Sequence, residues 1–175
     1  DPYADTVGPG IYGGIVKRDE DGRVVIGRQY QNHNPRPGPV YAGGGYTPTC
    51  RALSDASRLR TLLTKFPELA NDVSTGGALP LHNCGMSRQN QGQVSILVEA
   101  GADIEALDTY GYTPLHRMAS NNLAHGAQLL LNAGADPNFL GGSGETPAQI
   151  ARSSHATDVL RLLNQWGAKK KHVAI

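Results

Sequence analysis

The sequence has little of several features on which common protein classes depend. Of its 175 residues, two are cysteine, one is tryptophan and two are phenylalanine, and the formal net charge at pH 7 is +1. No block of like charge is longer than Lys169-Lys170-Lys171, so the basic surface typical of nucleic-acid binders is missing. No apolar run approaches the roughly 18 residues of a membrane-spanning helix, and no segment reads as a signal peptide. We therefore expect protein partners, no nucleic acid and no direct membrane span.

The two cysteines, Cys50 and Cys84, are too few for a disulfide framework, and there is no Asn-X-Ser/Thr sequon. We interpret them as two reduced thiols in a reducing, intracellular compartment, where disulfides are rare. The chain begins with Asp1 instead of Met. Either a leader has been removed or the sequence is partial, and both readings stay open.

What the sequence does have is an internal repeat. Gly-Ala pairs recur every 33 residues, at Gly101-Ala102, Gly134-Ala135 and Gly167-Ala168. Prolines that can open a helix recur at intervals of 32, 34 and 33 residues, at Pro48, Pro80, Pro114 and Pro147. Slips of one residue belong in loops. A fixed period of this length predicts a stack of similar units.

The clearest unit runs from Asp108 to Asp136. Thr113 is a good N-cap and Pro114 suits the first helical position, so a helix is predicted to begin there and to end at Asn121-Asn122. A second apolar-periodic stretch follows, and Gly134 supplies its left-handed stop. The unit is a helix, a turn, a second helix and a loop.

This unit resembles the ankyrin repeat family, whose period is 33 residues and whose signature is Thr-Pro-Leu-His, here Thr113-Pro114-Leu115-His116. The resemblance covers about Tyr46 to Gly167 and weakens at both ends, as is usual for capping repeats. It implies an all-α fold, an ankyrin-repeat solenoid of about four helix-turn-helix repeats. It also implies a structural, hydrogen-bonding role near the preceding turn for His82 and His116.

Three regions are predicted. Residues 1–45 form an extended Gly/Pro/Tyr-rich arm with a β-hairpin between Ile15 and Ile26, residues 46–167 the ankyrin repeat domain, and residues 168–175 a basic tail. A lone hairpin buries too little apolar surface to order itself. We therefore expect the arm to anchor on a partner or along the repeats through its tyrosines, Tyr3, Tyr12, Tyr30 and Tyr41.

Two repeats depart from the signature. Leu79 replaces the N-cap threonine of the second repeat, which puts that helix start in question, and an extra residue near Arg88 to Gln91 predicts a longer turn. The fourth repeat has Ala148-Gln149 in place of Leu-His, which is typical of a closing cap.

No constellation predicts catalysis. Cys50, His82 and His116 would form a column, but metal ligands lie about 2.0 to 2.3 Å from one ion, whereas stacked helices are about 8 to 10 Å apart. The Gly-rich strings lack the Gly-Lys-Ser/Thr ending of a phosphate loop, and no Gly-X-Ser-X-Gly elbow occurs. We expect no metal, no cofactor and no enzyme activity.

What remains is surface. Ankyrin partners usually dock on the loop tips and on the inner face of the first helices, and the resemblance carries this role to Tyr46, Arg88, Thr109, Tyr110, Tyr112, Arg117, Ser120 and Asn121. Tyr and Arg dominate binding hot spots. The alternative is that these tyrosines pack on neighbouring loops.

The sequence thus predicts a non-catalytic protein-protein interaction module, a scaffold or peripheral subunit of a larger complex. The alternative is a soluble adaptor or assembly factor that binds a client through its concave face. The strings Pro80 to Ser87 and Tyr110 to Asn122 resemble ankyrin proteins of photosynthetic algae. That resemblance implies a plastid complex, such as a thylakoid photosystem or antenna assembly, ahead of mitochondrion or cytosol.

Overall fold

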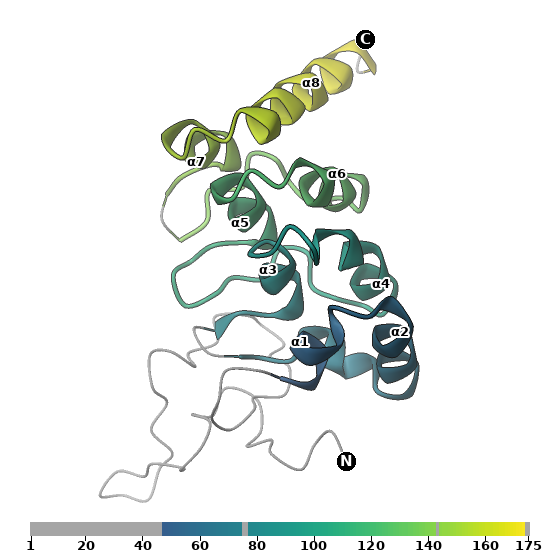
Figure 1. Cartoon of the computed structure of the whole chain (residues 1–175). Coiled ribbons are helices and arrows are strands. Elements are labelled where there is room, and N and C mark those ends of the chain that lie inside the picture. The colour runs from purple at the N-terminus through teal and green to yellow at the C-terminus, as the bar shows by residue number, and fades with distance from the viewer. Residues whose placement is uncertain (1–46, 75–76, 143, 174–175) are drawn as a thin grey trace, which may run out of the picture.

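The computed structural model describes residues 47–74, 77–142 and 144–173, and over these residues it is a stack of four helix pairs (Figure 1). The first helix of each pair forms an inner row: α1 (Pro48–Ala52), α3 (Pro80–Cys84), α5 (Pro114–Ser120) and α7 (Pro147–Ser153). The second helix forms an outer row: α2 (Ala56–Lys65), α4 (Val94–Glu99), α6 (Ala124–Asn132) and α8 (Thr157–Val173). Short 3-10 turns, η2 (Pro67–Asn71) and η4 (Gln91–Gln93), lie between them.

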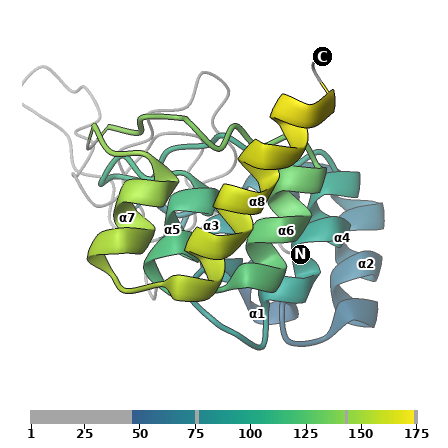
Figure 2. The same ribbon diagram turned by 90° about the horizontal axis from the view of Figure 1, so that it is seen from above.

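The two rows stack in parallel. Seen from above, α7, α5 and α3 follow one another on one side and α8, α6, α4 and α2 on the other (Figure 2). Each inner helix packs on the next inner helix and each outer helix on the next outer helix. The described residues contain no β-ladder longer than a single bridge residue, so the predicted all-α repeat fold is confirmed for them.

The helix starts follow the threonine-proline signature. Thr47, Thr113 and Thr146 have extended backbones, and each hydroxyl accepts a hydrogen bond from the backbone N–H three residues later. Helix α3 begins at Pro80 although Leu79 has no hydroxyl. The Leu79 N–H instead donates to Nδ1 of His82 at 3.0 Å, so this histidine supplies the only side-chain bond at that helix start.

The core is a ladder of leucines and small residues between the rows. Leu59, Leu81, Leu97, Leu115 and Leu130 are among the fully buried side chains. Burying one leucine contributes about 1.5 to 3 kcal/mol, and in a stack of repeats part of this burial comes from contacts between neighbours. The loops before α5 and α7 project from this packed core on the left of Figure 1.

The extra residue of the second repeat lies in the turn, as predicted. Helix α3 ends at Cys84 and α4 begins only at Val94, whereas α5 and α6 are separated by three residues, Asn121 to Leu123. Asn122 takes a positive φ of 55° at that shorter turn, which fits the predicted helix end.

The last Gly-Ala pair behaves differently from the others. Gly101 and Gly134 adopt φ values of +97° and +106° and end their helices, but α8 continues through Gly167 to Val173. After Gly134 comes Pro137, which cannot extend a helix, whereas Gly167 is followed by alanine and three lysines, which favour one. The predicted tail, residues 168–175, thus begins inside α8 instead of after it.

Several predictions fall outside the described residues: the arm with its hairpin, Tyr3, Tyr12, Tyr30, Tyr41 and Tyr46. Across the part of the chain that is described, no helix is long and apolar enough to cross a bilayer.

Candidate partner-binding site

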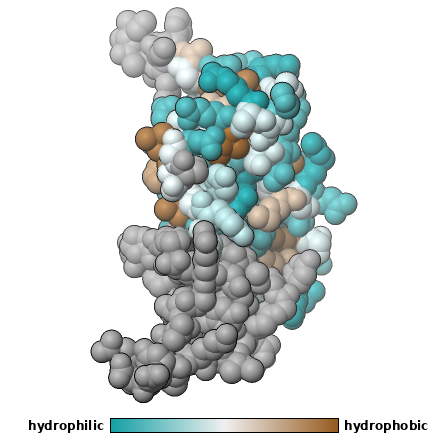
Figure 3. All heavy atoms as spheres, turned by 90° about the vertical axis from the view of Figure 1, so that its left-hand side faces the viewer, coloured by the Kyte–Doolittle hydropathy of each residue, from teal (hydrophilic) through white to brown (hydrophobic). Residues whose placement is uncertain are grey.

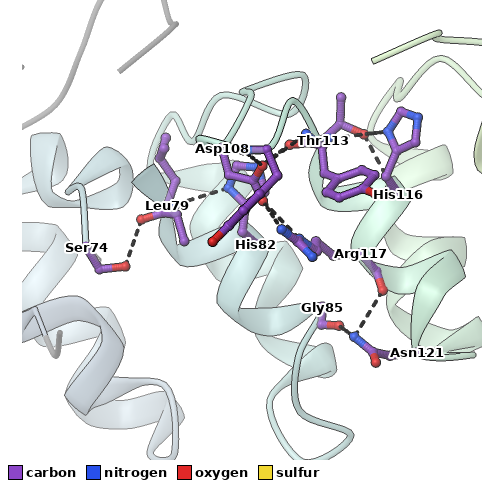
Figure 4. Close-up of polar contacts among 12 residues, drawn as sticks. Ser74, Leu79, His82, Gly85, Asp108, Thr113, His116, Arg117 and Asn121 are labelled. Atoms are coloured by element: carbon purple, nitrogen blue, oxygen red, sulfur yellow. Dashed lines mark hydrogen bonds and ion pairs between the residues drawn. The ribbon is translucent and has the colours of Figure 1, made fainter. Parts of the chain in front are cut away.

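Two histidines tie the loops of the third and fourth repeats to the inner helices. His82 Nε2 lies 2.8 Å from the Tyr112 carbonyl oxygen, and His116 Nε2 lies 2.7 Å from that of Glu145. A carbonyl can only accept, so Nε2 carries the proton and Nδ1 is the acceptor. Nδ1 of His116 accordingly accepts from the Thr113 backbone N–H at 3.3 Å (Figure 4). The predicted structural role is confirmed, and each histidine also reaches the next loop.

The environment keeps both imidazoles neutral. Burial lowers the pKa of His82 and of His116 below the ordinary value of 6.5. A second proton would sit on Nδ1 and face a backbone N–H donor at 3.0 Å in His82 and 3.3 Å in His116. These residues are thus fixed braces for the loops and not titrating groups of a catalytic site.

A buried ion pair holds the loop before α5. Oδ1 of Asp108 accepts from the backbone N–H groups of Tyr110 and Tyr112 at 2.9 and 3.0 Å. Its Oδ2 accepts from Nε and Nη2 of Arg117 at 2.9 and 2.5 Å (Figure 4). The Asp108 side chain is 1% exposed and that of Arg117 18%. One carboxylate therefore fixes both the turn and the arginine on the following helix.

The two tyrosines of this loop take different positions. Tyr110 is 64% exposed, whereas Tyr112 is half-buried and packs against the core. The Arg117 guanidinium lies 4.5 Å from the Tyr112 ring centroid and 5.8 Å from that of Tyr110, both within reach of cation–π attraction. Tyr112 thus partly follows the alternative prediction, in which the tyrosines pack on neighbouring loops. Tyr110 is exposed to solvent on a loop that hydrogen bonds hold in place.

The next loop leans on this one. Gly142 donates its N–H to the Gly111 carbonyl at 2.7 Å, and a Cβ on Gly111 would lie 2.6 Å from the Gly142 Cα. Gly111 has a φ of +80°, so both the turn and the contact require glycine. Leu140, two residues before Gly142, is 58% exposed. Tyr110 and Leu140 therefore flank one contact between adjacent loops.

A small hollow opens beside these loops, between α5 and α7. Its volume is about 150 Å³, and its lining includes Tyr112, Arg117, Ser120, Glu145, Ile150 and Ser153. The face that bears the loops is largely hydrophilic over the described upper repeats, with separate apolar patches (Figure 3). We refer to Tyr110, Leu140 and these six of the eight lining residues as the loop surface.

The predicted binding residues are only partly brought together. Tyr110, Tyr112, Arg117 and Ser120 belong to the loop surface, and Thr109 lies in the same turn. Asn121 uses its amide to donate to the Gly85 carbonyl at 2.7 Å, which joins α3 to α5 (Figure 4). Arg88 is exposed on the α3–α4 turn and does not line the hollow.

The alignment missed three features of this surface. Asp108, Leu140 and Glu145 were not among the predicted residues. For Asp108 a signal existed, because aspartate at the start of a turn commonly accepts from the backbone N–H two residues later. For Leu140 and Glu145 there was none, because exposure and the shape of the inter-repeat hollow depend on the neighbouring repeat.

The two thiols lie between the first two repeats. Cys50 and Cys84 are free, and burial raises the pKa of Cys50 to about 11 and that of Cys84 further above its ordinary value. The Asn83 amide donates to the Cys50 sulfur at 2.7 Å. These environments disfavour the thiolate, so neither is an activated nucleophile. Among described residues no group of three His, Cys, Asp or Glu side chains could hold a metal ion.

The structure is a repeat domain of the kind that presents a protein-binding surface. Its marks are the paired helices, the threonine-proline helix starts, the hydrogen bonds from His82 and His116 to the loops, and the projecting loops themselves. Comparison with known families agrees: residues 97–151 match the family model described as ankyrin repeats (many copies). The chain thus contains ankyrin repeats, and these support a protein-protein interaction module.

Similar proteins share the repeats and differ in what surrounds them. Ankyrin repeat and SOCS box protein 16 of Mus musculus is 38% identical over 90 residues, 51% of this chain and 19% of that protein. Human protein phosphatase 1 regulatory subunit 27 is 33% identical over 91 residues, 52% of this chain and 58% of that protein. The Saccharomyces cerevisiae target of rapamycin complex 2 subunit AVO2 is 36% identical over 76 residues, 43% of this chain and 18% of that protein. The chain matches about a fifth of the first of these relatives.

Proposed function

We propose that this protein binds a protein partner through the loop surface of its third and fourth repeats, as a non-catalytic scaffold or peripheral subunit. The observation that carries the proposal is Tyr110, a large aromatic side chain that is 64% exposed on a turn whose backbone is bonded to a buried carboxylate. Rigid aromatic side chains make good binding anchors because little conformational freedom is lost when they are covered.

The surroundings of Tyr110 support a binding role over chance exposure. Leu140 adds a second exposed apolar side chain on the adjacent loop. Two of the similar proteins are named as subunits: one is a regulatory subunit of protein phosphatase 1 and the other a subunit of target of rapamycin complex 2. A subunit role is consistent with both names.

The test is quantitative capture from the native source. Tyr110→Ala should weaken partner binding by about 1 to 3 kcal/mol, roughly a 5- to 150-fold rise in Kd, as hot-spot truncations do. Its free energy of unfolding should change by less than about 0.5 kcal/mol because the ring is exposed. Arg161→Ala, whose side chain is 70% exposed on α8, is the matched control.

Captured proteins are identified by mass spectrometry, and Kd values are then measured on the purified pair. Equal retention of partners by wild type and Tyr110→Ala would remove the proposal. A fall in stability for Tyr110→Ala would instead make Tyr110 a packing residue and misplace the surface.

The alternative, a soluble adaptor or assembly factor, uses the same surface but leaves its client. Gel filtration of the native extract distinguishes the two, because a subunit co-elutes with a stoichiometric complex and an assembly factor does not. The plastid complex implied by the algal resemblance is part of this proposal, and fractionation of the source organism tests it.

A further inference from the structure

The hollow between α5 and α7 has the size of one side chain. Its volume of about 150 Å³ is below the roughly 300 to 1,000 Å³ of pockets that enclose small-molecule ligands. It opens within the loop surface, beside the turn that carries Tyr110. A partner that covers Tyr110 would therefore bring its own side chains over this opening.

The charges around the hollow do not cancel. Arg117 and Glu145 are its charged lining residues, and Arg117 is already paired with the buried Asp108. Over residues 47–74, 77–142 and 144–168 two ion pairs form, Arg117–Asp108 and Arg161–Asp158, and Glu145 belongs to neither. Counting Asp108, Arg117 and Glu145, one formal negative charge is left over, at Glu145.

The other lining groups suit a cationic guest. Hydroxyl groups of Ser120, Ser153 and Ser154 offer acceptor lone pairs, and Tyr112 contributes an aromatic ring. Burial lowers the pKa of the remaining titratable lining residue, His116, so it adds no positive charge near neutral pH. Arg152 is exposed on α7 but does not line the hollow.

We infer that the hollow between α5 and α7 receives a lysine or arginine side chain of the protein partner, with Glu145 as its counter-ion. This inference rests on the proposed function and adds the chemistry of the partner: a basic residue placed next to the group that covers Tyr110. Acidic guests are disfavoured because Glu145 would repel them, and Arg117 has its carboxylate already.

The test uses defined probes on the whole chain. The isotope-labelled protein is titrated with N-acetyl-lysine methylamide and N-acetyl-arginine methylamide, and amide chemical shifts are followed by NMR. The norleucine derivative keeps the four-carbon stem of lysine without the ammonium group, and the glutamate derivative carries a negative charge instead of a positive one. At least one basic probe should shift the amides of Ser120, Glu145 and Ser153, and norleucine and glutamate should not.

The Glu145→Gln variant identifies the counter-ion. A solvent-accessible ion pair is worth about 0.2 to 1 kcal/mol, so Glu145→Gln should raise the Kd of the basic probe by about 1.4- to 5-fold. Glu99→Gln, an exposed glutamate on the outer helix α4, should leave it unchanged. Raised salt should weaken binding to wild type more than to Glu145→Gln.

The inference is overturned if neither basic probe shifts these amides, if norleucine or glutamate shifts them equally, or if Glu145→Gln and Glu99→Gln bind alike. The capture experiment with Tyr110→Ala is independent of these results. If Tyr110→Ala loses the partner but the basic probes do not bind, the inferred basic side chain is excluded and the loop surface is retained. If the basic probes bind selectively but Tyr110→Ala keeps the partner, the proposed function is excluded and the hollow is left as a cation-binding site.

Discussion

Replacing Asp108 by asparagine tests whether one carboxylate organises the loop that carries Tyr110. The carboxylate accepts four N–H bonds, two from the turn backbone on Oδ1 and two from Arg117 on Oδ2. An asparagine has one acceptor oxygen and one donor amide of nearly the same shape. Whichever way the amide lies, two of the four donors then face another donor.

The cost can be estimated from the bonds that are lost. A hydrogen bond to a charged group contributes about 1.5 to 3 kcal/mol, so two amount to roughly 3 to 6 kcal/mol. The Arg117 side chain is 18% exposed and can turn partly toward water, which recovers some of this. We therefore expect Asp108→Asn to lower the free energy of unfolding by about 2 to 4 kcal/mol.

Asp55→Asn is the matched control. Its Oδ1 also accepts two backbone N–H groups, from Ser57 and Arg58, but it caps an exposed helix end and has no arginine partner. Asparagine caps helices as well as aspartate does, so the change should be within about 0.5 kcal/mol.

The assay is urea unfolding followed by far-ultraviolet circular dichroism, with Arg117→Met and the double variant completing a thermodynamic cycle. The double variant should be more stable than the sum of the two single changes predicts, by about 1 to 3 kcal/mol. A loss of less than about 0.5 kcal/mol for Asp108→Asn, or a coupling near zero, would refute the idea that this pair holds the loop.

Two further predictions concern stability elsewhere. Burial raises the pKa of Asp72 from 3.8 to about 7, so the folded protein binds a proton that the unfolded chain releases, and stability is lost as pH rises toward 7. From pH 5 to pH 8 we expect wild type to lose about 2 to 3 kcal/mol relative to Asp72→Asn, measured by urea unfolding; parallel pH profiles would contradict this. Gly85→Ala would place a Cβ 2.7 Å from the Arg117 Cβ, so thermal and urea unfolding should show a loss of about 1 to 3 kcal/mol. Gly92→Ala, whose nearest neighbour would be 3.8 Å away, is its control, and equal stabilities would show that α3 and α5 can separate without cost.

The repeat register was predictable because it depends on local signals. A threonine before a proline fixes where an inner helix begins, and Gly101 and Gly134 fix where two outer helices end, whatever their neighbours are. Leu79 was the doubtful case, and there the helix start depends on His82, three residues later. That hydrogen bond is also local, so the start of α3 is predictable once His82 is recognised as a residue that can accept from the Leu79 N–H.

The role of Arg117 could not be predicted from the same signals. By alignment it lies on the predicted binding face, and nothing in the eight residues between it and Asp108 requires a contact. The bond forms because the turn after Asp108 folds back over the first turns of α5, which brings Oδ2 to the guanidinium. Arg117 thus has a partner within the chain, and its contribution to binding stays a prediction.

The histidine position explains why the loop surface lies on the third and fourth repeats. His82 and His116 each reach the loop of the following repeat, whereas Cys50 stands at that position in the first repeat and accepts from the Asn83 amide instead. In the fourth repeat Gln149 stands at the histidine position. It makes the bond at its own helix start, where it accepts from the Thr146 N–H at 2.8 Å.

The loops that precede the third and fourth inner helices, α5 and α7, therefore each receive a hydrogen bond from a neutral imidazole. Asp108 and the Gly111–Gly142 contact also hold these loops. A loop that is already held in one conformation loses little entropy when a partner covers it. Tyr110 and Leu140 lie on these two loops, and the hollow between α5 and α7 lies beside them. The same hydrogen bonds that stabilise the stack thus preorganise the proposed binding surface. A change at Asp108 should therefore weaken both folding and partner affinity, whereas Tyr110→Ala should weaken affinity alone.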